Sequence, residues 1–457
     1  MKSFDAIVIG AGQAGPSLAG RLTGAGMSVA LIERKFVGGT CVNAGCMPTK
    51  TLIASARAAH VAGRAADFGI VLEGAPGIDI ARVRARAQTV IHNARSGQED
   101  WLGSMPGLTL IRSQARLLGA DTVQVGDETL TAPKIFLNVG GRPAKPDLDG
   151  IDSVPYLTST SMLALDTVPR HLVVVGGSYI GLEFAQMYRR FGAQVTVVER
   201  GDHLLPREDA DISQAIAEIL TAEGIAIRTK ADCIGLRPEG NDVAVRVNCT
   251  SGEPEVWGSH VLVATGRQPN TDDLGLDNAG VAVDGRGYIQ VDDRLATNVP
   301  GIWALGDCNG RGAFTHTSYN DFEIVAANLL DGDDRKLSDR ISAYALYIDP
   351  PLGRVGMSER EARATNRPIS ISTRPMSRVG RAIERDETKG FMKLIADTET
   401  QKILGAAILG IEGDEAIHGI LDIMNADIAY PTLQWAVPIH PTVSELIPTL
   451  VGGLKPA

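Results

Sequence analysis

Two cysteines five residues apart are the side chains of this sequence with the most evident chemistry. Cys41 and Cys46 lie in the segment GGTCVNAGCMPTK, residues 38–50. On an ideal α-helix the Cα atoms of residues i and i+5 are about 8.7 Å apart, whereas a relaxed disulfide needs about 7 Å or less. A bond between the two sulfurs therefore requires a locally distorted backbone, which Asn43 and Gly45 tolerate. A distorted bridge is easier to reduce, as a catalytic redox couple requires.

Two other interpretations of the pair stay open on the residues alone. A metal site needs about two more ligands, and none lies nearby in the sequence. Two structural free thiols are the second alternative, because free cysteine is often buried. The chain has five cysteines and no apolar N-terminal stretch of signal-peptide length. We therefore expect a cytoplasmic protein, in which a close cysteine pair is more often catalytic or metal-binding than structural.

The cysteine segment follows the first of two similar units. In each unit a short apolar run leads into a glycine-rich turn, a helix-like stretch and a second apolar run that ends on glutamate. The units cover residues 5–33 and 171–199, and the first glycine lies 23 residues before the glutamate in both. We expect a strand, a helix and a second strand in each.

This arrangement is the fingerprint of a dinucleotide-binding site. The glycines allow a tight turn and a close approach of the pyrophosphate, the helix N-terminus supplies amides, and the acid binds ribose hydroxyls. The second copy has Ser178 where the pattern expects its middle glycine. Two such sites in one chain favour a tightly held flavin and an exchangeable nicotinamide, although spacing alone does not say which site holds which.

Composition excludes several other classes of function. The chain of 457 residues has room for about three domains at roughly 100–200 residues each. Its 44 Lys and Arg against 54 Asp and Glu give a net charge of −10, which argues against nucleic acid as a partner. No apolar run is long enough to span a membrane, so we expect no membrane partner.

The cysteine segment closely resembles the redox-active segment of the class I pyridine nucleotide–disulfide oxidoreductases, which include glutathione reductase, dihydrolipoyl dehydrogenase and mercuric reductase. The resemblance extends over nearly the whole chain. It includes both fingerprints and the segments NVGGRP (138–143), ATGRQPN (264–270), GIWALGD (301–307), PPLGRVG (350–356) and HPTVSE (440–445).

The resemblance implies an α/β chain with two Rossmann-like domains, one for FAD and one for NAD(P), followed by a C-terminal α+β dimerisation domain. The expected ranges are 1–148 and 268–335 for FAD, 149–267 for NAD(P) and 336–457 for the dimerisation domain. Strands from Phe391 onward and a helix near 413–425 fit the last of these. A homodimer is the expected assembly.

The resemblance also assigns residues to the two cofactors. Glu33 would bind the adenosine ribose of FAD, Thr40 would lie near the pyrophosphate and Asp307 on the ribityl chain. Tyr179 would gate the nicotinamide pocket over the flavin. The expected FAD residues are Gly10, Gly12, Gly15, Glu33, Gly39, Thr40, Ala115, Gly141, Asp307 and Thr315; the expected nicotinamide residues are Gly176, Tyr179, Gly181, Glu199, Arg200 and Gly266.

Six residues would form the catalytic set by the same resemblance. Cys46 would be the thiolate next to the flavin, and Cys41 the thiol that meets the substrate. Lys50 and Glu183 would form an ion pair beside the flavin N5, where a lysine stabilises negative charge. His440 and Glu445 would act as an acid–base pair on Cys41 of the partner subunit, because thiol–disulfide exchange needs a proton donor.

The nicotinamide preference rests on two neighbouring residues. Glu199 favours NADH, because a carboxylate bonds the free 2′-hydroxyl and repels a 2′-phosphate. Arg200 offers a partial site for that phosphate, so use of NADPH as well stays open.

The acceptor is predicted from shorter segments. MPTKT (47–51), PRED (206–209) and FT (314–315) resemble the mercuric-reductase-like and reactive-chlorine-resistance flavoproteins, members of which reduce Hg(II) or Cu(II). The last cysteine is Cys308, so the terminal cysteine pair of mercuric reductase itself is missing. We expect a metal ion as acceptor and no resident metal. The alternatives are dihydrolipoyl dehydrogenase or another small-disulfide reductase, and a redox-sensing binding flavoprotein. The basic run Arg374–Arg385 is expected to be a solvated face.

Overall fold

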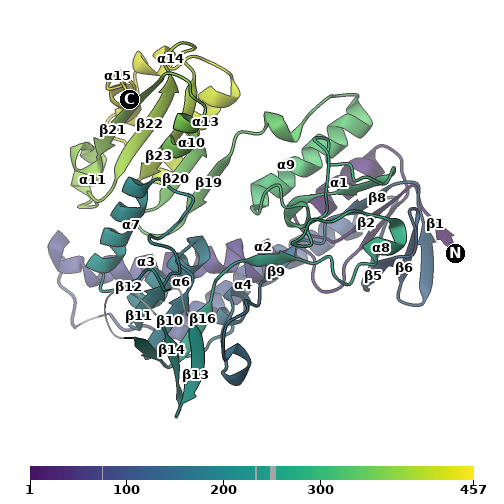
Figure 1. The fold of residues 1–457 in the computed structure, drawn as a ribbon, viewed down its shortest axis with the longest axis horizontal. Helices are drawn as coiled ribbons and strands as arrows, with labels where there is room; N and C mark the ends of the chain where they lie inside the picture. The colour runs from purple at the N-terminus through teal and green to yellow at the C-terminus, as the bar shows by residue number, and fades with distance from the viewer. Residues whose placement is uncertain (75, 232–233, 248–253) are drawn as a thin grey trace.

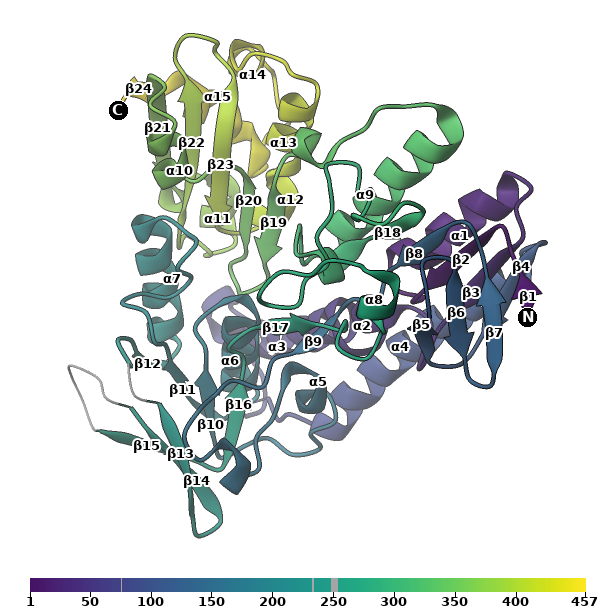
Figure 2. The same cartoon turned by 45° about the vertical axis from the view of Figure 1, so that its right-hand side comes forward.

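The computed structural model describes residues 1–74, 76–231, 234–247 and 254–457 (Figures 1 and 2). Cys233 and Cys249 lie outside these residues. Two parallel sheets and one antiparallel sheet form the frame, and helices pack on them. The expected α/β class with a separate C-terminal α+β part is confirmed.

The first parallel sheet carries the first predicted unit. Its central strand is buried throughout, because helices cover one face of the sheet and a small antiparallel sheet covers the other. Its last strand in sequence lies beside β8, so the chain returns to this sheet after completing the second one. In sheet order the strands are β18 (Ile302–Ala304), β8 (Ile135–Leu137), β2 (Ala6–Ile9), β3 (Val29–Ile32) and β4 (Leu108–Ile111).

The second parallel sheet carries the second unit. Helix α6 (Tyr179–Arg190) links its two central strands, and α7 (Ala210–Ala222) precedes the edge strand. The order is β12 (Ala226–Arg228), β11 (Gln194–Val198), β10 (His171–Val175) and β16 (His260–Val263). An antiparallel sheet of β13 (Gly235–Glu239), β14 (Asp242–Arg246) and β15 (Glu255–Gly258) flanks it.

The C-terminal part is an antiparallel sheet with helices on it. The strands and helix predicted from Phe391 onward are confirmed, except that two helices, α12 (Gly413–Ala416) and α13 (His418–Asn425), replace the single one. The sheet order is β19 (Ala343–Leu346), β20 (Leu352–Gly356), β23 (Ile403–Leu409), β22 (Phe391–Asp397), β21 (Ile369–Pro375) and β24 (Lys455–Pro456).

Shorter elements complete the frame. A small four-stranded sheet packs against the first parallel sheet, in the order β1 (Lys2–Ser3), β7 (Glu128–Thr131), β6 (Thr122–Val125) and β5 (Ala115–Leu117). A separate two-stranded sheet pairs β9 (Gly141–Pro143) with β17 (Arg267–Pro269). The remaining helices are α1 (Ala14–Gly24), α2 (Gly39–Ala44), α3 (Cys46–Gly63), α4 (Ile80–Gly103), α5 (Ser159–Met162), α8 (Leu276–Ala279), α9 (Thr315–Ala326), α10 (Glu359–Ala364), α11 (Gly380–Glu384), α14 (Pro431–Gln434) and α15 (Ile447–Gly452).

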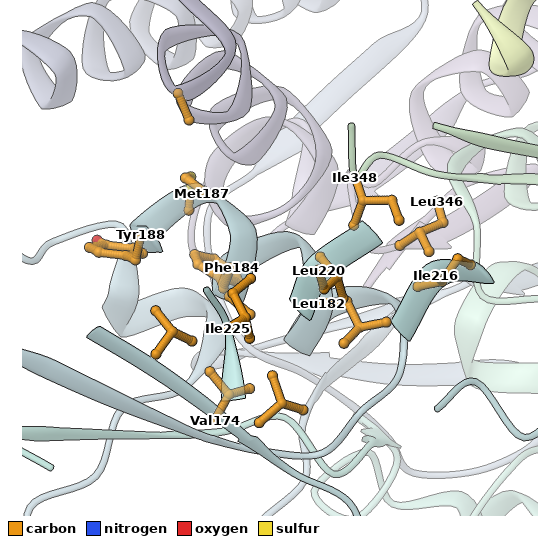
Figure 3. Close-up of a cluster of buried hydrophobic side chains, with 14 of the residues drawn as sticks. Val174, Leu182, Phe184, Met187, Tyr188, Ile216, Leu220, Ile225, Leu346 and Ile348 are labelled. Atoms are coloured by element: carbon orange, nitrogen blue, oxygen red, sulfur yellow. The ribbon is translucent and has the colours of Figure 1, made fainter. Parts of the chain in front are cut away.

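One apolar core joins the second parallel sheet to the C-terminal part. Figure 3 shows Leu346 and Ile348, which belong to the C-terminal part, among side chains of α6 and α7 such as Leu182 and Leu220. All four side chains are almost completely removed from water. The contact fixes β19 against the helices of the second sheet, and β19 thereby lies beside the cavity described next.

Candidate active site

A single large cavity contains nearly all of the predicted site residues. Its volume is about 2240 Å³, well above the roughly 300–1,000 Å³ that holds one drug-sized ligand. Both glycine-rich turns line it, and so do Cys41, Cys46, Lys50 and Glu183. The cavity therefore has room for two large ligands that meet near the cysteines.

The first glycine-rich turn is shaped by backbone contacts that leave no space for side chains. A Cβ on Gly10 would lie 2.2 Å from the carbonyl oxygen of Asn138, and Gly10 has a φ of +105°. A Cβ on Gly39 would lie 2.8 Å from the Cα of Gly12. Gly15 does not line the cavity: a Cβ there would lie 2.1 Å from the Gly10 oxygen, so this glycine lets α1 pack against the turn.

The second turn repeats these contacts. A Cβ on Gly176 would lie 2.6 Å from the Ala264 oxygen, and a Cβ on Gly181 would lie 2.0 Å from the Gly176 oxygen. Gly181, like Gly15, lies outside the cavity lining. Helices α1 and α6 both begin without a side-chain cap and without an acid in the first turn. Apart from the Gly15 amide, which donates to the Asn138 side chain at 3.1 Å, the first amides of these helices are not capped by a side chain and can bind phosphate oxygens.

The two terminal acids are also held alike. Glu33 accepts hydrogen bonds from the amides of Ala11 (2.9 Å) and Lys35 (2.8 Å), one on each carboxylate oxygen. Glu199 accepts from the amides of Gly177 (2.6 Å) and Gly201 (2.7 Å) in the same way. Each oxygen keeps a lone pair for a ribose hydroxyl. Arg200, which is exposed, lines the cavity next to Glu199.

The remaining predicted cofactor residues line the cavity too: Thr40, Ala115, Gly141, Gly266, Asp307 and Thr315. Burial raises the pKa of Asp307, and the guanidinium of Arg267, 3.3 Å away, partly opposes this. Arg267 also donates a hydrogen bond to the Gly141 oxygen at 2.6 Å. A half-buried carboxylate that lines a cavity is a hydrogen-bond partner for ligand hydroxyls.

The distortion predicted between the two cysteines is present. Helix α2 ends at Ala44 and α3 begins at Cys46, because Gly45 leaves the helical conformation with φ −137° and ψ −117°. Both cysteines are unbonded thiols, with Cys41 half-buried and Cys46 exposed. Cys46 also occupies the first position of an 18-residue helix, where the helix dipole favours a negative charge.

The two thiols differ in acidity. The Cys41 thiol donates a hydrogen bond to Cys46, and this bond, the Thr315 hydroxyl at 3.2 Å and the charge of Lys50 lower the pKa of Cys46 to about 6. The same hydrogen bond and burial raise the pKa of Cys41. At neutral pH the pair therefore consists of one thiolate, Cys46, and one neutral thiol, Cys41.

Lys50 and Glu183 form the predicted ion pair. The Nζ atom of Lys50, on α3, lies 2.9 and 2.7 Å from the two carboxylate oxygens of Glu183, on α6. Glu183 is buried and also accepts a hydrogen bond from the Tyr347 amide at 3.0 Å. The Tyr347 ring lies 4.6 Å from Lys50 Nζ, a cation–π distance. The ammonium group is thus fixed on the cysteine side of the cavity.

His440 and Glu445 lie apart from this cavity. His440 Nδ1 is 2.8 Å from a Glu445 oxygen, so the predicted pair exists. Neither residue lines the cavity, and the His440 side chain is 79% exposed. Large apolar side chains beside it, Trp435, Val437 and Ile439, are 80%, 96% and 80% exposed.

Several functional residues were missed from the sequence. Asn138 holds the first turn by accepting from the Gly15 amide, and it lies in the NVGGRP segment, as Arg267 lies in ATGRQPN. A local signal for these two was therefore present. Glu208 accepts a hydrogen bond from the Tyr179 hydroxyl at 3.0 Å and lies in the PRED segment, although that segment gave no indication of this contact. Tyr347 carries no sequence signal, because its contact with Glu183 arises only in the folded structure.

The other expectations concern the surface and metals. In the basic run, Arg381 pairs with Glu384 and the Pro441 oxygen, and Arg385 pairs with Glu412. Among the described residues no group of three or more His, Cys, Asp or Glu side chains is placed to hold a metal ion. In the same part of the chain no helix has the length and apolarity needed to cross a membrane.

Comparisons with known proteins agree with this geometry. The family described as pyridine nucleotide-disulphide oxidoreductase matches residues 4–321, and its dimerisation domain matches residues 342–451. A probable pyridine nucleotide-disulfide oxidoreductase RclA of Escherichia coli is 37% identical over 463 residues, 100% of each chain. A solved structure titled as the Cu(II) complex of the HOCl-induced flavoprotein disulfide reductase RclA from this organism has a TM-score of 0.90, with 36% identity and 99% of each chain covered.

Two further relatives have other names. A dihydrolipoyl dehydrogenase of Chlamydia pneumoniae is 34% identical, over 97% of this chain and 95% of its own. A mercuric reductase of Streptomyces lividans is 34% identical, over 89% of this chain and 86% of its own.

Proposed function

Because this chain belongs to the pyridine nucleotide–disulfide oxidoreductase family, as a class I enzyme of an FAD- and NAD(P)H-dependent group, we propose that it reduces a metal ion such as Hg(II) or Cu(II) with electrons from NADH. The electrons pass through FAD and the Cys41–Cys46 pair. One observation carries the proposal: both thiols line the cavity that the two glycine-rich turns also line, and Cys46 begins α3 with its sulfur 3.2 Å from the Thr315 hydroxyl.

The residues present fit both cofactors. The first cradle, where a Cβ on Gly10 or Gly39 would collide with backbone, suits the FAD pyrophosphate, with Glu33 on the ribose and Asp307 on the ribityl hydroxyls. The second cradle suits the nicotinamide nucleotide, with Glu199 on its ribose. When bound, FAD supplies two-electron transfer from NAD(P)H to the cysteine pair. Lys50, held by Glu183, supplies positive charge beside it.

The cysteines change between two states in the proposed cycle. Reduction of the Cys41–Cys46 disulfide breaks one S–S bond and consumes two electrons and two protons, leaving two thiols, of which Cys46 ionises first. Thiolates are preferred ligands of soft cations. The pair can therefore bind Hg(II) directly, and it can hold the soft Cu(I) that one-electron reduction of Cu(II) gives. Overall NADH gives NAD⁺, H⁺ and two electrons, enough for one Hg(II) or two Cu(II) ions.

A second candidate function is reduction of a small disulfide. The hydrogen-bonded His440–Glu445 pair favours it, because a thiolate leaving a disulfide needs a proton and a metal ion does not. The pair lies outside the cavity, beside the exposed Trp435, Val437 and Ile439. We propose that these apolar side chains contribute to a homodimer in which His440 of one subunit approaches Cys41 of the partner subunit.

The finer assignments follow from the same geometry. NADH is the proposed donor, because Glu199 presents a fixed carboxylate where NADPH would place a phosphate. We propose domain borders at residues 148, 267 and 335; the return of β18 to the first sheet supports an FAD domain in two parts. A reducing compartment, the cytoplasm, would keep both thiols available.

The test is anaerobic NADH oxidation by the purified yellow protein with Hg(II), Cu(II), lipoamide and glutathione disulfide as acceptors. Wild type, Cys41→Ser and Cys308→Ser run side by side; Cys308 is a buried thiol with two carbonyl oxygens in reach of its single hydrogen, and a serine hydroxyl can donate to either of them. Turnover with the metal ions alone, lost only in Cys41→Ser, is expected. Turnover with a disulfide alone would replace the metal proposal by the second candidate, and full activity in Cys41→Ser would overturn the dithiol relay.

A further inference from the structure

Two tyrosine hydroxyls meet on one oxygen of a buried carboxylate. Glu208 Oε1 accepts a hydrogen bond from Tyr179 at 3.0 Å and another from Tyr344 at 2.7 Å. Glu208 is only 1% exposed. The carboxylate does not line the cavity, whereas both tyrosines do. Glu208 therefore connects the cavity wall to the protein interior.

The three residues come from three separate parts of the chain. Tyr179 is the first residue of α6, Glu208 lies just before α7, and Tyr344 is on β19 of the C-terminal sheet. The shared core of Leu346 and Ile348 with α6 and α7 fixes that sheet against these helices (Figure 3). The hydrogen bonds of Glu208 thus join two parts of the chain, the C-terminal sheet and the helices of the second parallel sheet, whose relative position apolar packing already fixes.

The charge of Glu208 is held by the two hydroxyls on one oxygen and by an ion pair on the other. Its other oxygen, Oε2, lies 3.5 Å from Nη1 of Arg354, a buried residue of β20, and makes no hydrogen bond within the described part of the chain. Burying a carboxylate is costly unless donors compensate for the lost water. Each tyrosine hydroxyl therefore forms a strong, charge-assisted bond rather than an incidental contact.

The two tyrosines are not held equally. The Tyr344 ring stacks on Phe314 with centroids 5.7 Å apart, and Phe314 stacks in turn on His316 at 5.4 Å. Tyr179 meets this wall only edge-on, through Tyr344 at 5.6 Å. Of the two rings, Tyr179 is the one that can leave the wall while Tyr344 stays in place.

We propose that Glu208 is a positioning residue that latches the Tyr179 ring in the cavity, so that an entering nicotinamide must break the Tyr179–Glu208 hydrogen bond. The inference rests on the proposed function, in which Tyr179 covers the nicotinamide pocket. While the latch is closed, the ring limits access of water and small solutes to the flavin. Breaking the Tyr179–Glu208 hydrogen bond costs free energy, and this cost lowers the net affinity for the nicotinamide nucleotide.

Tyr179→Phe tests the latch, because it keeps the ring and removes only the hydroxyl. We expect the Kd of NAD⁺ for the oxidised holoenzyme, measured by titration, to fall about tenfold to hundredfold, the value of one hydrogen bond to a charged group. Iodide should quench the flavin fluorescence more strongly in the same variant. The direction of the change in NAD⁺ affinity distinguishes the two roles of the hydroxyl. Loss of a hydroxyl that contacts NAD⁺ would weaken binding, whereas loss of the latch should strengthen it.

Tyr344→Phe is the matched control. It removes a hydrogen bond of the same kind to the same Glu208 oxygen but leaves Tyr179 attached, so NAD⁺ affinity and iodide quenching should stay at wild-type values. Equal changes in the two variants, or no change in Tyr179→Phe, would overturn the latch. The proposed function is judged separately, by whether NADH bleaches the flavin of the wild-type protein without oxygen.

Discussion

The hydroxyl oxygen of Thr315 lies 3.2 Å from the sulfur of Cys46, although the two residues are 269 positions apart. This bond is one of the causes that lower the pKa of Cys46 to about 6. The thiolate of the reduced protein should therefore form as the pH rises through about 6. It should be nearly complete at pH 7, well below the range of an ordinary thiol.

Thr315→Val should raise the pKa of Cys46 by about one unit, because a hydrogen bond to the charged form is lost. Alkylation of Cys46 by iodoacetamide, followed by mass spectrometry across pH, measures this directly. At pH 6.5, set between the two expected midpoints, the variant should react several-fold more slowly. Thr317→Val is the control, since that hydroxyl bonds the Phe314 oxygen instead; an equal shift there would contradict the assignment.

Mixed dimers test whether one active site uses two subunits. With a disulfide such as lipoamide as the acceptor, Cys41→Ser should abolish turnover and His440→Gln should strongly reduce it, because the leaving thiolate then lacks its proton donor. If Cys41 and His440 act across the dimer, a mixed dimer of the two variants holds one intact site. Random mixing should then restore about a quarter of wild-type activity. If both residues serve the same subunit, mixing restores nothing.

The charge of Glu199 should decide between the two nicotinamide nucleotides. Glu199→Gln keeps an oxygen that can accept from the Gly177 amide or the Gly201 amide but removes the charge. We expect the ratio of kcat/KM for NADH over NADPH to fall by about tenfold, the scale of one lost repulsion of a phosphate. Glu33→Gln, which changes the equivalent acid of the first unit, should leave that ratio unaltered.

The helix glycines should differ sharply in tolerance of a methyl group. Gly15→Ala places a Cβ 2.1 Å from the Gly10 oxygen, so α1 must move away from β2, and we expect more than about 3 kcal/mol of destabilisation. Gly24→Ala, at the end of the same helix, meets nothing within 4 Å and should be neutral or stabilising by about 0.5–1 kcal/mol. Thermal unfolding of both variants gives the comparison.

The sequence was informative wherever function depends on neighbours along the chain. A glycine turn fits between a strand and a helix because of local sterics, so both units could be placed to within a few residues. The backbone break at Gly45 followed from simple helix geometry. The same reasoning could not say that Gly15 and Gly181 serve helix packing rather than the cavity surface.

Contacts between distant residues could not be predicted. Tyr347 holds Glu183 from 164 positions away, and Tyr344 reaches Glu208 from 136 positions away. No pattern of spacing records such pairs, because they exist only once the C-terminal sheet has packed on α6 and α7. These contacts fix the orientation of the Glu183 and Glu208 carboxylates, which the sequence motifs alone do not determine.

The placement of Leu346 and Ile348 inside the core of the neighbouring helices bears on how chains of this kind can diverge. The C-terminal sheet is not a portable module, since cutting the chain ahead of β19 would expose apolar side chains on both fragments. A recombinant of two homologues joined at that point would fold well only if the apolar side chains of its C-terminal sheet fitted those of α6 and α7 from the other parent. Because of this contact, the C-terminal sheet and the second parallel sheet are expected to change together during evolution.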